Sequence, residues 1–382
     1  MTISIVNGRF LSPEGILVAD DVTIENGLIG AVGAAGSGLR IDAAGLLILP
    51  GIIDLHGDAF ERQLMPRPGV HFATELALLD TDRQMLANGI TTAFHGLTWS
   101  WEPGLRGTEA ALEFVGALAG LKGRLGCDTR LHLRFETFNL DAVDTIAGWL
   151  AEGTVDLLAF NNHYPEIAAK TPSEKVKFAE RARLSAEAFD TLLTAVGDRA
   201  DAVPSAVTRL AGLALAHGVV MASHDDAAPE TRRWYHRLGA HLCEFPETRE
   251  TAETARALGD AIIMGAPNVV RGGSHLGGMS AAELAGQGLC EVLSSDYYYP
   301  SLLQAPFRLH RDQILPFPQA WSLVSAGPAR LAGFTDRGDI APGKRADMIL
   351  VDTRDPGLPQ VVATFIGGEP AHCAGNILMR SA

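Results

Sequence analysis

The sequence predicts an α/β fold: a TIM-like (β/α)8 barrel with a small β-sandwich domain built from both chain ends. Two observations predict the barrel. Eight apolar, strand-like runs lie between residues 49 and 337, and amphipathic helix-like segments separate most of them. A third observation predicts the sandwich, because short strand-like runs with glycine turns occupy residues 1–48 and 338–382.

The length and composition fit an ordered globular protein with more than one unit. The 382 residues exceed the size at which a single core usually stops growing, and 47% of them are apolar against 20% charged. The net charge of −14, with no basic block, argues against nucleic acid and anionic membranes as partners. An anionic small molecule bound in a local basic pocket remains compatible with this charge.

Cysteine usage and the chain start predict a cytoplasmic protein. Cys127, Cys243, Cys290 and Cys373 are far apart and form no Cys-x-x-Cys pair, which favours reduced thiols. The first ten residues lack the basic and apolar regions of a signal peptide, and no apolar run reaches the ~20 residues of a membrane span. The oligomeric state stays open, with a homo-oligomer as one alternative.

The two chain ends are predicted to pair into the sandwich. The N-terminal runs end in a hairpin, because Asn26 and Gly27 separate two of them and this dipeptide favours a tight turn. The predicted strands are residues 3–6, 22–25 and 28–32 at the N-terminal end and 346–351 and 361–366 at the C-terminal end.

The eight runs of the barrel each have the length of a buried strand. Such runs, alternating with helical segments, are typical of parallel strands, and eight is the number that closes a barrel. The predicted strands are residues 52–56, 90–95, 130–136, 156–163, 219–224, 240–245, 261–266 and 291–296. The predicted helices include residues 141–151, 173–196 and 204–217.

Metal-binding residue types recur where these runs end. The first run ends on His56 and Asp58, which lie two apart and so project to one side of a strand. A helix cap or a core histidine is the simpler explanation for any one such residue, but coincidence explains five strand ends poorly. Because a barrel gathers its strand ends around one mouth, the set can hold one or two divalent ions. The candidates are His56 with Asp58, Glu136, His163, His224 and Asp296.

The third run predicts a polar stripe inside the barrel. His132, Arg134 and Glu136 alternate with three apolar residues, and the apolar face must meet the helices. Buried polar groups need partners. For Arg134 we expect a structural ion pair, with Asp54 of the first strand as its partner.

Asp296, at the end of the last run, is the predicted catalytic base. The three tyrosines at 297–299 form either a wall of the site or a packed loop. At least one of Asp225 and Asp226 is expected to cap the following helix.

The remaining histidines have weaker contexts. His95 and His275 are candidates for supporting or substrate-binding groups. The others are expected to be structural or on the surface: His71, His132, His217, His236, His241, His310 and His372.

Two segments suit a phosphate group. Arg67 follows the first strand by a short loop, and a glycine-rich loop follows the seventh strand, where barrels often bind phosphate. An ordinary flexible turn is the alternative for the glycines. The predicted substrate-binding residues are Arg67, Arg271, Gly272, Gly273, Ser274 and His275.

These residues resemble a known family. The segments 50–56 and 343–351, with the eight runs, resemble the amidohydrolase superfamily, whose barrel is flanked by a β-sandwich built from both chain ends. Within it, the chain resembles the phosphonate-metabolism hydrolases of the carbon–phosphorus lyase pathway. The segments that carry this second resemblance are 54–58, 65–70, 222–226, 265–275 and 293–297.

The resemblance implies a metal-dependent hydrolase that converts α-D-ribose 1-methylphosphonate 5-triphosphate and water into the 5-phosphate and pyrophosphate. It implies metal-ligand roles for the strand-end residues, with one or two ions of zinc, manganese or iron. Most of the superfamily has a histidine where this chain has Asp58, and many members bridge two metals with a carbamylated lysine. No lysine lies at a predicted strand end here, so Glu136 is the better bridging candidate.

The expected mechanism is attack of metal-activated water on the α-phosphorus. Asp296 accepts the proton, while Arg67, Arg271 and the glycine loop offset phosphate charge. One alternative is a deaminase or cyclic amidase of the same fold, although a neutral ring needs no anion site such as the Arg271 loop. The other is a non-catalytic scaffold, which would lack bound metal.

Overall fold

A computed structural model describes residues 2–33, 36, 38–67, 69–273, 279–374 and 379–381. Its central element is a sheet of eight parallel strands in sequence order, from β8 to β15. The eight predicted strands are confirmed to within a few residues. The strands are β8 Ile52–Gly57, β9 Ile90–Trp99, β10 Asp128–Glu136, β11 Leu157–Asn161, β12 Val220–His224, β13 Leu242–Glu244, β14 Ala261–Gly265 and β15 Val292–Ser294.

The first and last strands meet just beyond β15. The backbone N–H of Asp296 donates to the carbonyl of His56 at 2.9 Å, and the N–H of Asp58 donates to the carbonyl of Asp296 at 2.9 Å. These bonds bring the two ends of the sheet together at the carboxyl side of the strands, so the predicted (β/α)8 barrel is confirmed.

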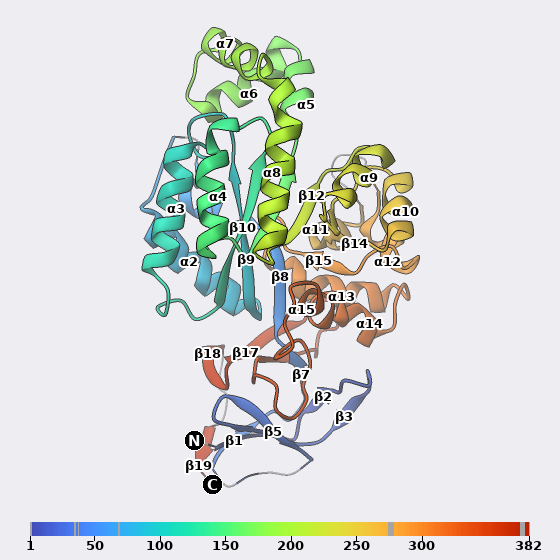
Figure 1. The fold of residues 1–382 in the computed structure, drawn as a ribbon. Helices are drawn as coiled ribbons and strands as arrows, with labels where there is room; N and C mark the ends of the chain where they lie inside the picture. The colour runs from blue at the N-terminus through green and yellow to red at the C-terminus, as the bar shows by residue number, and fades with distance from the viewer. Residues whose placement is uncertain are drawn as a thin grey trace.

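Helices cover the outside of the barrel (Figure 1). The outward side chains of β10, such as Leu133 and Phe135, are fully buried in one apolar cluster with Phe114 and Ile146 of the covering helices. The α-helices are α1 Glu61–Leu64, α2 Thr74–Ala87, α3 Thr108–Gly120, α4 Val143–Glu152, α5 Tyr164–Ala169, α6 Pro172–Ala182, α7 Ala186–Gly197, α8 Val203–Ala216, α9 Pro229–Arg237, α10 Arg249–Leu258, α11 Ala266–Arg271, α12 Ala281–Gly286, α13 Ser301–Arg311, α14 Phe317–Ser322 and α15 Ala326–Leu331.

The predicted helix over residues 173–196 is two helices, α6 and α7. The chain breaks at Arg183, whose φ of 57° is left-handed and cannot continue a helix. A new helix then begins at Ala186, and its N-cap Ser185 accepts a side-chain hydrogen bond from the backbone N–H of Ala188. Together with α5, these helices lie beyond the ends of β10 and β11, at the top of Figure 1.

The two chain ends form two sheets that pack on each other, as predicted. One sheet has the order β19-β6-β1-β4-β5, and the other has the order β18-β17-β16-β7-β2-β3, so N-terminal and C-terminal strands are mixed in both. The strands are β1 Thr2–Val6, β2 Arg9–Leu11, β3 Leu17–Ala19, β4 Val22–Glu25, β5 Leu28–Val32, β6 Leu39–Asp42, β7 Leu46–Pro50, β16 Met348–Asp352, β17 Gln360–Ile366, β18 Glu369–Cys373 and β19 Met379–Ser381. The predicted hairpin between β4 and β5 forms, and both its turn residues, Asn26 and Gly27, have positive φ.

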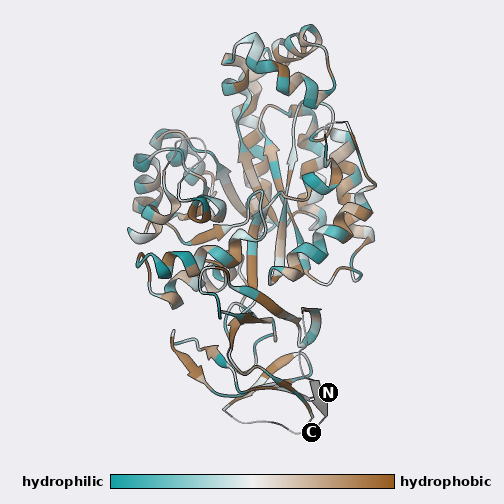
Figure 2. Ribbon diagram, turned by 180° about the vertical axis from the view of Figure 1, so that it is seen from behind, coloured by the Kyte–Doolittle hydropathy of each residue, from teal (hydrophilic) through white to brown (hydrophobic). Residues whose placement is uncertain are grey.

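The six-stranded sheet is a middle layer between the sandwich core and the barrel. Alternate residues of β7 pack in opposite directions: Ile48 belongs to the sandwich core, whereas Leu47 and Leu49 belong to the core shared with the barrel helices. In Figure 2 these strands include long hydrophobic stretches, whereas the outer helices alternate between hydrophilic and hydrophobic residues. Because β7 leads directly into β8, the sandwich joins the barrel at the amino end of its strands, and the carboxyl ends face away from it (Figure 1).

All four cysteines are free thiols. Across the described residues, no helix combines the length and apolar character that crossing a membrane requires.

Candidate active site

The carboxyl ends of the barrel strands open into a cavity of about 620 Å³. Its wall carries residues at or after the ends of β11, β12, β13, β14 and β15, together with Arg134 from β10. The polar side chains that line it are Arg134, His163, Glu166, His224, Asp225, Glu247, Asn268, Arg271, Asp296 and Tyr297. Three of the predicted strand-end residues, His163, His224 and Asp296, therefore face one space.

The predicted donor residues come together in two neighbouring clusters. Donor atoms of His56, Asp58 and Asp296 all lie within 4.8 Å of one another, and so do donor atoms of His163, His224 and Asp225. The rings of His56 and His224 stack with centroids 5.2 Å apart, which joins the two clusters.

Glu136 completes the second cluster through His163. Its carboxylate oxygen Oε1 lies 2.5 Å from Nδ1 of His163, and Nε2 of the same ring lies 3.1 Å from Oδ2 of Asp225. Burial opposes a charged imidazole, but the two carboxylates raise the pKa of His163 to about 10. A divalent cation bound to one of these ring nitrogens would replace the proton that it shares with its carboxylate.

Glu244 is a site residue that the sequence analysis missed. It ends β13, is fully buried, and its Oε2 lies 3.2 Å from Nδ1 of His56 and 3.2 Å from Nδ1 of His224. Its pKa is held well below the usual value, because the rings of His132 and His56 outweigh the effect of burial. Because Glu244 contacts Nδ1 of His56 and of His224, Nε2 of each ring points away from it. Metal-binding histidines in proteins are commonly oriented in this way, by a carboxylate on the nitrogen that does not bind the metal.

Arg134 lies between the two clusters. Its guanidinium donates to Oδ2 of Asp58 at 2.9 Å and to Nε2 of His224 at 2.9 Å. Burial opposes ionisation of Asp58, but the charge of Arg134 holds the pKa of Asp58 below its ordinary value. The predicted polar stripe of β10 is confirmed, since His132, Arg134 and Glu136 all point into the barrel.

The predicted partner of Arg134 was wrong. Asp54 accepts hydrogen bonds from the hydroxyl and backbone N–H of Ser295, at 2.5 and 3.0 Å, and within the described chain no ion pair joins it to Arg134. The reason is a register irregularity in β8 between Asp54 and Gly57, which breaks the alternation of side chains. Asp54 and His56 therefore do not share a face, although they are two residues apart.

Asp296 sits where the sheet closes. Its backbone has a φ of 53°, and its side chain lies beside Asp58 and His56. Burial and the neighbouring Asp58 carboxylate raise the pKa of Asp296 to about 6. A bound cation would act in the opposite direction, because positive charge stabilises the carboxylate.

The residues present fit divalent metal. Nε2 of His56 is buried and has no hydrogen-bond partner among the described residues, and the carboxylates of Asp58 and Asp296 lie beside it. Imidazole nitrogens with carboxylate oxygens are the donors that zinc, manganese and iron accept in proteins. Two of the groups that could hold a metal ion therefore lie at the predicted strand ends.

The structure brings only part of the predicted substrate-binding set to the cavity. Arg271, at the end of α11, lines it. Gly272 lines a different hollow between α11 and α13, Gly273 lines neither, and Arg67 is exposed in the loop after α1 and is not among the cavity residues. Ser274 and His275 lie outside the described residues. Sequence adjacency failed here because α11 ends at Arg271 and the chain turns at Gly272, whose φ of 85° is left-handed.

The structure places the tyrosines at 297–299 and the aspartates at 225 and 226, for which the sequence allowed more than one role. Tyr297 lines the cavity and Tyr299 is buried, so the tyrosine segment is partly wall and partly packing. Neither Asp225 nor Asp226 caps α9, whose N-cap is Ala228, and that prediction was wrong. Asp225 lines the cavity, whereas Asp226 is buried against Arg232.

His95 does not reach the cavity. Its ring packs on Phe60 and Phe114 in the barrel–helix core, and burial lowers its pKa to about 4.

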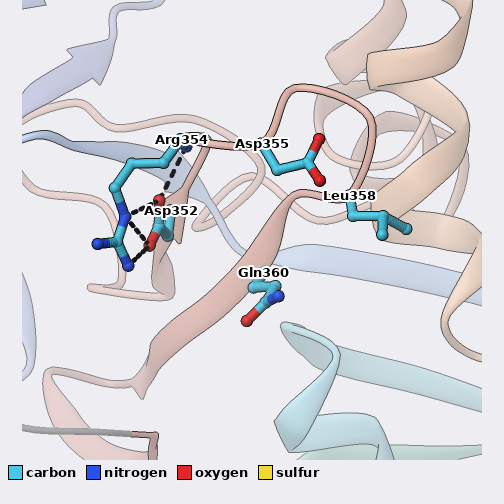
Figure 3. A pocket seen from close by; sticks show the side chains of 5 residues that line it. All are labelled: Asp352, Arg354, Asp355, Leu358 and Gln360. Carbon is cyan, nitrogen blue, oxygen red and sulfur yellow. Dashed lines mark hydrogen bonds and ion pairs between the residues drawn. The ribbon is translucent and has the colours of Figure 1, made fainter.

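Another hollow lies over the sandwich, formed by Asp352, Arg354, Asp355, Leu358 and Gln360 (Figure 3). Its cation, Arg354, is already paired with Asp352 at 2.6 Å, so the residues that line this hollow offer no unpaired cation to a ligand.

Comparison with solved structures supports the fold. The chain matches an amidohydrolase from a Sargasso Sea environmental sample with a TM-score of 0.67 at 16% identity, covering 99% of this chain and 94% of that one. It matches 5-methylcytosine deaminase from Klebsiella pneumoniae with a TM-score of 0.65 at 15% identity, covering 99% of each chain. Dihydropyrimidinase from Brevibacillus agri gives a TM-score of 0.63 at 15% identity, over 100% of this chain and 97% of that one. At these identities the matches establish the amidohydrolase fold.

Comparison with known sequences establishes the family. No family model matches the chain. The chain is 34% identical over 363 residues to alpha-D-ribose 1-methylphosphonate 5-triphosphate diphosphatase of Escherichia coli K12, an alignment that covers 92% of this chain and 96% of that enzyme. The resemblance to phosphonate-metabolism hydrolases inferred from short segments is thus confirmed across almost the whole length. The chain belongs to the family of alpha-D-ribose 1-methylphosphonate 5-triphosphate diphosphatases.

Proposed function

We propose that the chain hydrolyses α-D-ribose 1-methylphosphonate 5-triphosphate to the 5-phosphate and pyrophosphate, with divalent metal at the strand-end clusters. The observation that carries this proposal is the 34% identity to the Escherichia coli diphosphatase over nearly all of both chains. The cavity supports it, because cationic Arg134 and Arg271 lie in the same wall as the metal-type donors.

The proposed metal ligands are the six residues of the strand ends, His56, Asp58, Glu136, His163, His224 and Asp296, joined by Asp225. A divalent metal held there supplies Lewis-acid polarisation and makes water more acidic. Glu244 orients the two stacked histidines through their Nδ1 atoms. Zinc, manganese and iron all suit this mixture of nitrogen and oxygen donors.

Asp296 is the proposed base. In the hydrolysis, an oxygen–phosphorus bond forms between water and the α-phosphorus, the bond from the α-phosphorus to the bridging oxygen breaks, and pyrophosphate leaves. Asp296 accepts the proton of the attacking water at its carboxylate. Its position between the first cluster and the open cavity suits this role, since its carboxylate belongs to both.

Two arginines are proposed to hold the phosphates. Arg271 lines the cavity wall from α11, and Arg134 is buried at its base, hydrogen-bonded to Asp58 and His224. Guanidinium groups bind phosphate oxygens through paired N–H donors and stabilise charge that builds up on them. Arg67, exposed in its loop, has no part in this proposal.

The test is product analysis with the purified chain loaded separately with zinc, manganese or iron. Incubation with α-D-ribose 1-methylphosphonate 5-triphosphate in ¹⁸O-labelled water should give pyrophosphate and 5-phosphate in equal amounts, with the label in the 5-phosphate. A parallel panel of dihydropyrimidines, cytosines and ureas tests the amidase and deaminase alternative. Turnover of that panel without pyrophosphate release would overturn the proposal.

A further inference from the structure

A second group of metal-type side chains lies away from the cavity. His236 lies in the last turn of α9, His241 precedes β13, and Asp260 precedes β14. Donor atoms of the three residues all lie within 4.8 Å of one another. Because Asp260 and His241 precede their strands, the group sits at the amino ends of β13 and β14, opposite the cavity mouth (Figure 1).

The carboxylate of Asp260 is the fixed centre of this group. Its Oδ1 lies 2.8 Å from Nδ1 of His236 and 3.0 Å from Nδ1 of His241. Its Oδ2 lies 3.2 Å from Nε of Arg232, whose side chain is completely buried. Arg232 is itself held by Ser223 at 2.7 Å and by the carbonyls of Ala240 and Leu242. The carboxylate is therefore positioned before any ligand arrives.

The two histidines are open to solvent to different degrees. The side chain of His241 is 62% exposed and that of His236 is 28% exposed, whereas Asp260 is fully buried. Arg232 supplies a charged partner for Asp260, which it shares with Asp226 at 3.3 Å. The Nδ1 atoms of both rings converge on one oxygen of this buried carboxylate, and the rings themselves are open to solvent.

We infer that His236, His241 and Asp260 form a peripheral site for a divalent transition metal, separate from the strand-end clusters. Two imidazole nitrogens and one carboxylate oxygen match the protein ligands of many zinc sites, and water would supply the fourth ligand. Zinc bonds of about 2.0–2.1 Å in a tetrahedron separate neighbouring donors by about 3.3 Å. The observed separations of 2.8 and 3.0 Å need only a small outward movement of the two exposed rings.

Zinc stoichiometry tests this inference. The holoenzyme, with its strand-end sites filled and excess metal removed, is titrated with Zn²⁺ by calorimetry and checked by elemental analysis. The wild-type chain should bind one further equivalent per chain. The double substitution His236→Ala with His241→Ala should lose that equivalent, while His217→Ala with His310→Ala, which removes two other exposed histidines, should retain it.

The single substitution His241→Ala keeps the test valid if the double variant misfolds. His241 is the most exposed member of the group, so its replacement should leave the fold intact. It should weaken the additional zinc binding at least tenfold and leave pyrophosphate release unchanged. A further equivalent that persists in both histidine variants, or its absence in the wild-type chain, would overturn the inference and leave Asp260 as a hydrogen-bonded structural carboxylate.

Discussion

Oε2 of Glu244 lies 3.2 Å from Nδ1 of His56, and both side chains are completely buried. The same oxygen lies 3.2 Å from Nδ1 of His224. Arg134 donates to Nε2 of His224, which requires that nitrogen to be an acceptor and places the ring proton on Nδ1, toward Glu244. One carboxylate at the end of β13 thus sets the orientation of two histidines from β8 and β12.

Replacing Glu244 with Gln should reduce metal affinity and turnover by about 10–100-fold, because an amide orients ring N–H groups less strongly than a carboxylate does. Metal content after dialysis and the rate of pyrophosphate release are the measurements. Asp82→Asn is the matched control, since Asp82 is also buried but accepts from the backbone of residues 126 and 127. Equal losses of metal content and of pyrophosphate release in the two variants would show that Glu244 does not orient the metal-binding histidines.

Replacing Arg134 with Gln should lower kcat/KM by about 10²–10³-fold, because the variant loses a buried charge beside the reacting phosphates. Steady-state kinetics with metal content measured in parallel separates this loss from loss of metal. Arg130→Gln is the control, because Arg130 lies on the same strand and pairs with Asp128 and Asp156 at the opposite end. Unchanged kinetics in the Arg134 variant would exclude its role in phosphate binding.

Replacing Gly57 with Ala should destabilise the chain by about 1–3 kcal/mol, through overpacking. A Cβ there would lie 2.7 Å from Oδ2 of Asp54 and 2.9 Å from Oγ of Ser295, so these two buried, hydrogen-bonded side chains must shift. The free energy of unfolding in urea is the measurement. Gly116→Ala in α3, with no atom within 4 Å of the new Cβ, should instead stabilise by roughly 0.5–1 kcal/mol.

Asp128 joins the barrel to the chain that returns to the sandwich. Its carboxylate lies 2.6 Å from Arg337 and 3.4 Å from Arg345. Burial opposes its ionisation, but hydrogen bonds from Arg130 and Arg337 lower the pKa of Asp128. Because the folded pKa lies below the unfolded value of about 3.9, the stabilisation is complete above that value and is lost as the pH falls through the folded pKa.

Asp128→Asn should therefore cost about 1–3 kcal/mol of unfolding free energy at neutral pH, and the difference from wild type should shrink in acid. Denaturation curves at neutral pH and below pH ~3.9 measure both effects. Asp144→Asn, which breaks only an exposed pair with Arg209, should change stability by less than about 1 kcal/mol. A difference for Asp128 that is the same at both pH values would contradict the linkage.

Much of the barrel could be predicted because each strand is signalled by its own short stretch of sequence. Parallel strands buried on both faces are continuous apolar runs, and their carboxyl ends share one mouth, so strand-end residues such as His56, His163 and His224 are brought together by topology alone. The alternation of polar and apolar residues along β10 was enough to predict that Arg134 and Glu136 face the barrel interior.

The predictions that failed concern structural details that no local sequence pattern specifies. The irregularity in β8 turned Asp54 toward Ser295, and a left-handed residue, Arg183, divided a long amphipathic stretch into α6 and α7. Glu244 was overlooked because β13 has only three residues, although a glutamate that ends an apolar run was the available signal. The direction of Arg67 and Gly272 depended on loop geometry, which adjacency in sequence does not specify.

The most direct test of the central claim compares wild type with Asp296→Asn on α-D-ribose 1-methylphosphonate 5-triphosphate, with metal content measured on the same samples. Asp355→Asn, on the sandwich side, is the control. Wild type and control should release pyrophosphate, whereas the Asp296 variant should keep its metal and lose turnover. Full pyrophosphate release by metal-loaded Asp296→Asn would contradict it.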